Sequence, residues 1–180
     1  MPNIVFRFPG GRYHATPWGN HVNEGLVEWP PSPWRIVRAL LATGFSKLGW
    51  HDPPPAAREL LEGLSSALPT YRLPAATAAH TRHFMPTDSP NPEKRTKIFD
   101  AFARVGRDSE LAVAWPVALS PAADALLRQL LPRLSYLGRA ESVVESRLVE
   151  DSELPDGLLA SASDTNRPGV EPIALLAPMS

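Results

Sequence analysis

Cysteine is absent from this chain of 180 residues, and so is any long apolar run. Without a thiol there is no disulfide, no cysteine nucleophile and no zinc site of the zinc-finger kind. No apolar stretch reaches the roughly eighteen residues of a membrane-spanning helix, and the N-terminus lacks the basic and apolar regions of a secretory signal. These absences predict a cytoplasmic protein with no membrane partner.

Signatures of common cofactor and catalytic sites are also missing. The sequence contains no phosphate-binding loop, dinucleotide fingerprint, zinc-protease motif or nucleophile elbow. His80 and His83 have a spacing that suits two ligands of one metal ion, but no third ligand stands convincingly near them. We therefore expect no cofactor and no metal site.

Proline is abundant, and charge is unevenly distributed. The 21 prolines exceed the average usage of about 5%, which predicts many stiff loops. Residues 1–140 carry 16 Lys and Arg against 11 Asp and Glu, a net charge of +5, whereas residues 141–180 carry 2 against 8, a net charge of −6. A basic body is compatible with nucleic-acid binding, because phosphate contacts are electrostatic, and equally with ordinary solvated faces.

Hydrophobic periodicity predicts an alternation of strands and helices. Ser32 and Ser120 each precede a proline, which is the arrangement of an N-cap and a first helical residue. The predicted strands are residues 3–8, 70–74, 98–105, 111–117 and 142–149. The predicted helices are residues 32–48, 56–68 and 121–137, the last one kinked at Pro132. In the first helix the expected buried stripe is Trp34, Val37, Leu41, Phe45 and Leu48.

This order of elements is that of an α+β, ferredoxin-like (RRM-like) βαββαβ fold. The predicted domain covers residues 1–150, with a basic β-hairpin inserted at about residues 75–107. Residues 151–180 lose periodicity and are expected to form an irregular acidic tail or linker. Such a sheet leaves one face free of helices, and RNA-recognition motifs stack bases on that face. The comparison is an analogy of fold alone.

The inserted hairpin and the first long loop supply the candidate RNA-binding residues. Basic side chains alternate with phenylalanines over residues 82–107, which suits a splayed single strand, although an ordinary exposed hairpin has the same composition. The loop at residues 12–21 is basic and aromatic without an evident structural reason. The candidates are Arg12, His14, Trp18, His21, Arg35, Arg38, Arg82, His83, Phe84, Lys94, Arg95, Lys97 and Arg139. For Arg35 and Arg38 the alternative is a solvated helix face.

Histidine also raises the possibility of catalysis. An imidazole titrates near neutrality and can activate a ribose 2′-hydroxyl, whereas a polar loop histidine that bonds backbone or phosphate is the simpler interpretation. If the chain is catalytic, the candidate residues are His80, His83, His14 and Tyr13.

Three segments carry a family resemblance. They read RYHATPWGNHVNEGLVEWPPSPWRIVRALL, HTRHFMP and SYLGRAESVVESRLVE, and together they span roughly residues 6–150. In this order they resemble the CRISPR-associated RAMP protein of type I-G (formerly I-U) systems, in which a Cas-five-like domain is fused to a Cas-six-like domain. Only the N-terminal, Cas-five-like half of that family fits in this chain.

The resemblance implies a CRISPR RNA-binding subunit of a Cascade-like antiviral effector complex. Such a subunit grips the repeat-derived 5′ tag of the guide RNA and caps the backbone of the complex. Its implied partners are the CRISPR RNA, the backbone and large subunits, and target DNA within the complex. Two alternatives stay open, namely a metal-independent endoribonuclease that processes precursor RNA with a loop histidine, and a scaffold that acts mainly through protein contacts.

Overall fold

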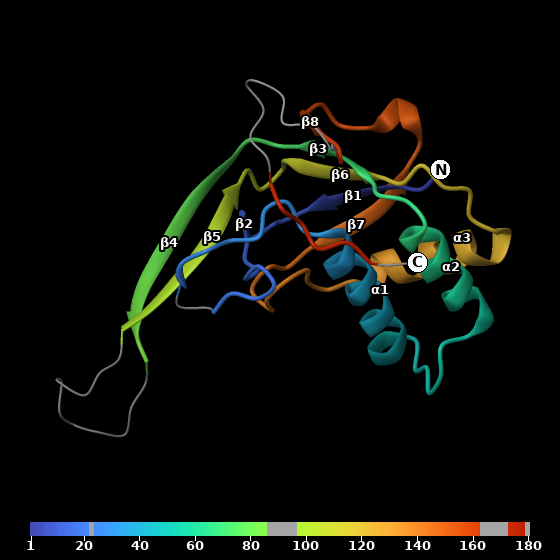
Figure 1. The fold of residues 1–180 in the computed structure, drawn as a ribbon, viewed down its shortest axis with the longest axis horizontal. Helices are drawn as coiled ribbons and strands as arrows, with labels where there is room; N and C mark the ends of the chain where they lie inside the picture. Colours follow the sequence, from blue (N-terminus) through green and yellow to red (C-terminus); the bar gives the residue numbers. More distant parts are fainter. Residues whose placement is uncertain (22–23, 86–96, 163–172, 179–180) are drawn as a thin grey trace.

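The computed structural model describes residues 1–21, 24–85, 97–162 and 173–178. The α-helices of these residues lie on one side of a large sheet, and a second sheet projects from this body as a long hairpin (Figure 1). The large sheet contains β1 (Asn3–Arg7), β3 (Thr70–Leu73), β6 (Glu110–Ala114), β7 (Glu145–Val149) and β8 (Leu158–Ala160). The small sheet contains β2 (Arg12–Tyr13), β4 (Ala76–Phe84) and β5 (Lys97–Val105). The helices are α1 (Pro33–Lys47), α2 (Pro55–Ser65) and α3 (Pro121–Leu130), with the 3-10 turns η3 (Leu131–Arg133) and η4 (Asp151–Glu153).

Both sheets are antiparallel, and their strand orders are β7-β1-β6-β3-β8 and β2-β5-β4. In the small sheet β4 pairs with β5 over nine residues, from Ala76 opposite Val105 to Phe84 opposite Lys97. The predicted combination of helices with antiparallel strands is therefore confirmed.

The core lies between the large sheet and the helices. Because side chains alternate along a strand, Ile4 and Phe6 of β1 and Val113 of β6 face the helices, where they pack with residues such as Leu40 and Leu127. Each of these five side chains is fully buried. Burial of this apolar surface is the main favourable term in folding.

The opposite face of the large sheet carries paired charges over β7, β1 and β6. Arg7 forms ion pairs with Glu145 (Nη2–Oε2, 2.6 Å) and Asp108, and Arg147 pairs with Glu110. The described strands present no aromatic ring on this face, since their outward positions alternate with the core residues. This face therefore differs from the base-stacking sheet of RNA-recognition motifs.

Helix α1 begins where the sequence predicts. The Ser32 side chain accepts a hydrogen bond from the backbone N–H of Arg35 (3.3 Å), Pro33 is the first helical residue, and Gly49 follows the C-cap with a φ of +69°. These local signals fix the orientation of the helix relative to the loop before it.

The predicted buried stripe of α1 is wrong in part. The buried apolar residues are Pro33, Ile36, Val37 and Leu40, with Gly44 on the same side, whereas Phe45 is exposed. The row Ile36, Leu40 and Gly44 has a spacing of four, and the Trp50 ring occupies the space where a Cβ on Gly44 would lie. Trp34 is only half-buried, because it stands at the side of this row.

The remaining differences lie near prolines and in the last part of the chain. Pro132 ends the α-helix instead of kinking it, because a proline has no N–H to continue the hydrogen-bond ladder. The predicted irregular tail is wrong for Leu158–Ala160, which pair with β3 as the edge strand β8. Residues 173–178 return to α1, where the Leu176 carbonyl accepts the Trp34 N–H (3.2 Å).

Trp115 provides a test of this core. It is fully buried, and its ring N–H donates to the Leu64 carbonyl (3.0 Å). Replacing Trp115 by Phe leaves this carbonyl unpaired and a void beside it, so we expect the free energy of unfolding to fall by about 3 kcal/mol. Trp18→Phe, at an exposed position, should change it by less than about 0.5 kcal/mol. Denaturant unfolding of both variants measures the difference, and equal stabilities would contradict the packing described.

Candidate functional site

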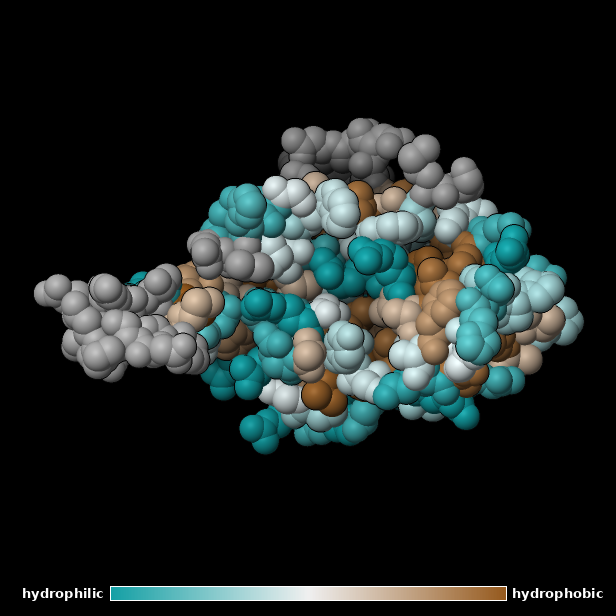
Figure 2. Space-filling view, turned by 90° about the horizontal axis from the view of Figure 1, so that it is seen from below, coloured by the Kyte–Doolittle hydropathy of each residue, from teal (hydrophilic) through white to brown (hydrophobic). Residues whose placement is uncertain are grey.

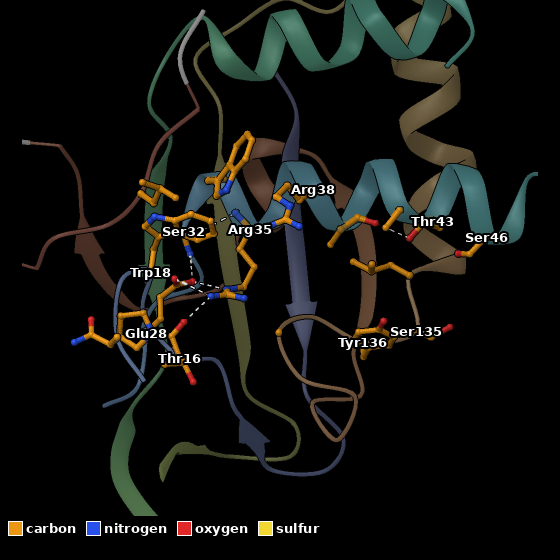
Figure 3. Close-up of a pocket in the computed structure, with 18 of the residues that line it drawn as sticks. Thr16, Trp18, Glu28, Ser32, Arg35, Arg38, Thr43, Ser46, Ser135 and Tyr136 are labelled. Carbon is orange, nitrogen blue, oxygen red and sulfur yellow. Dashed lines mark hydrogen bonds and ion pairs between the residues drawn. The ribbon is translucent and has the colours of Figure 1, made fainter. Parts of the chain in front are cut away.

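A cleft with a volume of about 710 Å³ runs along one side of α1. Residues from the loop at 16–20, from α1 and from the segment at 133–138 form its walls. Figure 3 shows side chains from these three segments around one space, among them Trp18, Arg38 and Tyr136. The cleft is therefore built by parts of the chain that are more than a hundred residues apart.

An ion pair forms one end of the cleft. Arg35 donates from Nε to Glu28 Oε1 (2.7 Å) and from Nη2 to Glu28 Oε2 (3.1 Å), and Nη2 also donates to the Thr16 carbonyl (2.9 Å). The nearly buried Glu28 carboxylate accepts a further hydrogen bond from the backbone N–H of Ser32 (2.9 Å). This bidentate geometry ties α1 to the preceding loop, and it neutralises the charge of Arg35.

Tyr13 belongs to the support of this pair. Its side chain is fully buried, and its hydroxyl donates to Glu28 Oε1 (3.4 Å). Burial, together with the Glu28 carboxylate, raises the pKa of Tyr13 well above its usual value, so the hydroxyl keeps its proton. Tyr13 was a candidate catalytic residue, but its position in the core keeps it away from any ligand in the cleft.

Three cations give the cleft its charge. Arg38, Lys47 and Arg133 line it, and Glu28 is the only carboxylate among its described lining residues. Within the described parts of the chain, no carboxylate forms an ion pair with any of the three. With Glu28 committed to Arg35, the cleft has a positive potential that attracts anions.

Exposed aromatic rings stand among these cations. Trp18 is 70% exposed and Tyr136 is 50% exposed, although large aromatic side chains usually gain by burial. The Arg38 guanidinium lies 5.8 Å from the Trp34 ring centroid. Positive charge beside accessible rings suits a polyanion that also offers planar bases. Seen from below, the molecule carries a hydrophilic region beside the hairpin and a more apolar region over the helical end (Figure 2).

A series of polar contacts, called here the polar chain, runs from residues 139–141 through His14 to Asp100 and His83 of the hairpin, next to the cleft. It runs from Glu141 Oε1 to His14 Nδ1 (2.7 Å), from His14 Nε2 to Arg139 Nη1 (3.2 Å), from Arg139 Nη1 to Asp100 Oδ1 (3.0 Å), and from Asp100 Oδ2 to His83 Nδ1 (3.5 Å). Because Arg139 can only donate, His14 Nε2 accepts, and the His14 proton is assigned to Nδ1, which donates to Glu141. His14 itself is nearly buried, so it positions Arg139 rather than facing solvent.

Gly138 joins the polar chain to the cleft, because it lines the cleft and precedes Arg139. Its φ is +90°, and a Cβ there would lie 2.5 Å from the His14 carbonyl oxygen. The glycine is thus required by close contact between two backbones. Gly138 does not cap the third helix, because α3 and η3 end before it.

The hairpin carries the other predicted binding residues on two faces. His80, Arg82 and Phe84 lie on the same face as Phe99 and Lys97, since they alternate along β4 and β5. Lys97 Nζ is 5.8 Å from the Phe84 ring centroid, and Arg82 Cζ is 5.7 Å from that of Phe99.

The remaining candidates are dispersed. Arg12 places its guanidinium 5.8 Å from the Phe102 ring centroid, on the hairpin face that also holds the polar chain. His21 is exposed and does not line the cleft. Lys94 and Arg95 lie outside the described residues.

The sequence-based candidate set omitted several residues of the site. Lys47, Arg133 and Tyr136 line the cleft, while Glu28 and Asp100 hold its neighbouring cations in place. Only Lys47 carried a usable signal, since it lies on the same helix as Arg35 and Arg38. The others reach the site through tertiary packing.

In the described ranges no group of three or more His, Asp or Glu side chains is placed to hold a metal ion. No helix among those residues has the length and apolarity needed to cross a bilayer. Comparison of the chain with models of known protein families and with curated protein sequences finds no match.

The pair of Glu28 with Arg35 can be tested by a nearly isosteric change. Glu28→Gln removes the charge and turns an amide toward the donors of Arg35, so we expect the free energy of unfolding to fall by about 2 kcal/mol, less than for a wholly buried pair because Arg35 is partly exposed. Glu62→Gln, at an exposed position of α2, is the matched control and should change it by less than about 0.5 kcal/mol. Equal unfolding midpoints for the two variants would show that the ion pair does not hold the cleft together.

Proposed function

We propose that this chain is a CRISPR RNA-binding subunit of a type I Cascade-like antiviral effector complex, which grips the repeat-derived 5′ tag of the guide RNA and caps the backbone. The observation that carries the proposal is the cleft beside α1, in which Arg38, Lys47 and Arg133 stand near the exposed rings of Trp18 and Tyr136. Cations bind phosphates and rings stack on unpaired bases, which is how single-stranded RNA is held.

The arrangement of strands supports the same assignment. We infer a ferredoxin-like core, because the adjacent strands β7, β1, β6 and β3 are the fourth, first, third and second strands of a βαββαβ unit. In that interpretation β4 and β5 form the inserted hairpin and β8 extends the sheet at its edge. The fold permits many functions, so the proposal depends on the cleft and on the family resemblance of the sequence.

The hairpin and the paired charges suggest which surface of the molecule contacts which partner. The cleft is assigned to the 5′ tag, and the projecting hairpin to contacts with RNA and with the backbone subunits. The large subunit and target DNA are the further partners that the resemblance implies. The open face of the large sheet, where Arg7 and Arg147 are committed to carboxylates, supports protein contacts more than RNA contacts.

Reversing two cleft charges tests the RNA site. We expect the double variant Arg38→Glu, Lys47→Glu to bind labelled guide RNA at least tenfold more weakly at moderate salt, because it loses two phosphate contacts and repels the backbone. The slope of log affinity against log salt should fall in magnitude by about 1.4. Arg58→Glu combined with Arg128→Glu, at exposed positions of α2 and α3 outside the cleft, changes the net charge equally, so it is the matched control and should bind nearly as the unaltered chain does.

Binding that requires the 5′ tag, without RNA products, would support the proposed role. Equal loss in the control with Arg58 and Arg128 replaced and in the cleft variant would mean that only net charge matters, which contradicts a defined site. Weak binding to free RNA, together with stable association with other effector subunits, would instead favour the scaffold interpretation.

One contact favours a second candidate, metal-independent RNA cleavage. The Asp100 carboxylate lies beside Nδ1 of the half-exposed His83, an arrangement that orients an imidazole and leaves Nε2 to act as a base. His83 Nε2 would take the proton of a ribose 2′-hydroxyl as O2′ bonds to phosphorus. The P–O5′ bond then breaks, water protonates O5′, and the products are a 2′,3′-cyclic phosphate and a 5′-hydroxyl.

An assay in EDTA separates cleavage from binding. If His83 is a base, discrete products form from repeat–spacer RNA, and His83→Ala reduces their rate by at least a hundredfold. His51→Ala, which changes an exposed histidine outside the polar chain, should leave the rate unchanged. No product from the unaltered chain would reject the nuclease and leave RNA binding as the function.

A further inference from the structure

A second, smaller cavity, called here the groove, lies on the other side of the hairpin base. It has a volume of about 400 Å³, within the range of small-molecule pockets. One wall is the loop at residues 25–29, with Leu26, Val27 and Trp29, and the other is the face of β4 and β5 that carries alanines. The groove is separate from the cleft beside α1, because the two share none of their described lining residues.

Its floor is built from unusually small side chains. Ala76 and Ala78 of β4 lie on the same face as Ala101 and Ala103 of β5, with Ala78 directly opposite Ala103. Alanine is disfavoured in strands, where β-branched and aromatic residues pack better. A run of alanines here weakens the hairpin, but it leaves depth between the strands and the loop. A ligand held in this space would account for the alanines.

An aromatic wall stands at one end of this floor. The rings of His80 and Phe99 are stacked, with centroids 4.5 Å apart and planes inclined by 23°. Gly25 brings the loop against this wall, since a Cβ at that position would lie 2.7 Å from a ring carbon of Phe99 and its φ is +70°. A flat wall above an apolar floor accommodates a flat ligand.

On the hairpin wall of the groove the charge is of one sign, whereas the loop wall carries Glu24 beside Gly25 and Glu28 committed to Arg35. Arg82 and Lys97 lie on the same hairpin face as the groove, and the described residues of that face include no carboxylate. Asp100, the acid of β5, faces the opposite side and is engaged by Arg139 and His83. A ligand that is apolar and planar in one part and anionic in the next matches this combination.

We propose that this groove is a pocket for one unstacked nucleobase of the bound single strand, whose neighbouring phosphates contact Arg82 and Lys97. The inference rests on the proposed RNA binding, and it adds a position at which the protein detects the presence of a base. An apolar side chain of a neighbouring subunit would also suit the alanine floor, but it would not use the cations beside it.

Abasic substitution tests this pocket. Oligoribonucleotides of the repeat-derived tag, each lacking one base in turn, are titrated against the unaltered chain. We expect one position at which loss of the base weakens binding about tenfold while the phosphate remains. Ala78→Leu fills the groove, and His80→Ala removes part of its wall. In both variants the ratio of the affinity for intact RNA to that for the abasic RNA should fall from about ten to about one. Thr81→Leu places the same leucine side chain on the other face of β4 and should keep the tenfold ratio.

The outcomes separate the pocket from the proposed function. If the unaltered chain binds RNA but no position is sensitive, or if the sensitivity persists in Ala78→Leu and His80→Ala, the pocket is rejected and the cleft is unaffected. If Ala78→Leu keeps the sensitivity and loses association with effector subunits, the groove binds protein. If the unaltered chain binds no RNA, the proposed function and the pocket both fail. Circular dichroism of each variant verifies that it is folded.

Discussion

The cleft beside α1 depends on one ion pair, between Glu28 and Arg35. A carboxylate removed from water is costly unless several donors satisfy it, and here it accepts from the Arg35 guanidinium, the Ser32 backbone and the Tyr13 hydroxyl. These contacts join the loop after β2 to the start of α1. Arg35 in turn holds the Thr16 carbonyl, so the loop that carries Trp18 keeps its place along the helix. The positive charge left for a ligand then comes from other residues.

The surfaces of the molecule differ in whether their cations are paired with carboxylates. On the open face of the large sheet, Arg7 and Arg147 are matched by carboxylates, which leaves little net charge over β7, β1 and β6. Around the cleft and on the groove side of the hairpin, described cations stand beside rings instead. An extended polyanion could therefore contact the body and the hairpin at once, whereas the open sheet face is left for other contacts.

Local sequence signals predicted the elements better than they predicted the site. The caps at Ser32 and Ser120 and the alternation through β1 and β6 are encoded within a few residues, and the structure agrees with them. The inward face of α1 was misjudged because Gly44 looks featureless until the Trp50 ring packs on it. Basic and aromatic composition identified Trp18, but no local pattern could place Tyr136 or Arg133 beside it.

Hydroxyl-radical footprinting of the protein, with and without guide RNA, determines whether the RNA lies in the cleft beside α1. Trp18 and Tyr136 are exposed within the cleft, whereas the similarly accessible Leu68 lies outside it. If RNA occupies the cleft, oxidation of both rings should slow several-fold on adding RNA while that of Leu68 is unchanged. Saturating RNA binding with undiminished oxidation of Trp18 and Tyr136 would mean that the strand lies elsewhere on the molecule and that the cleft is not the RNA site.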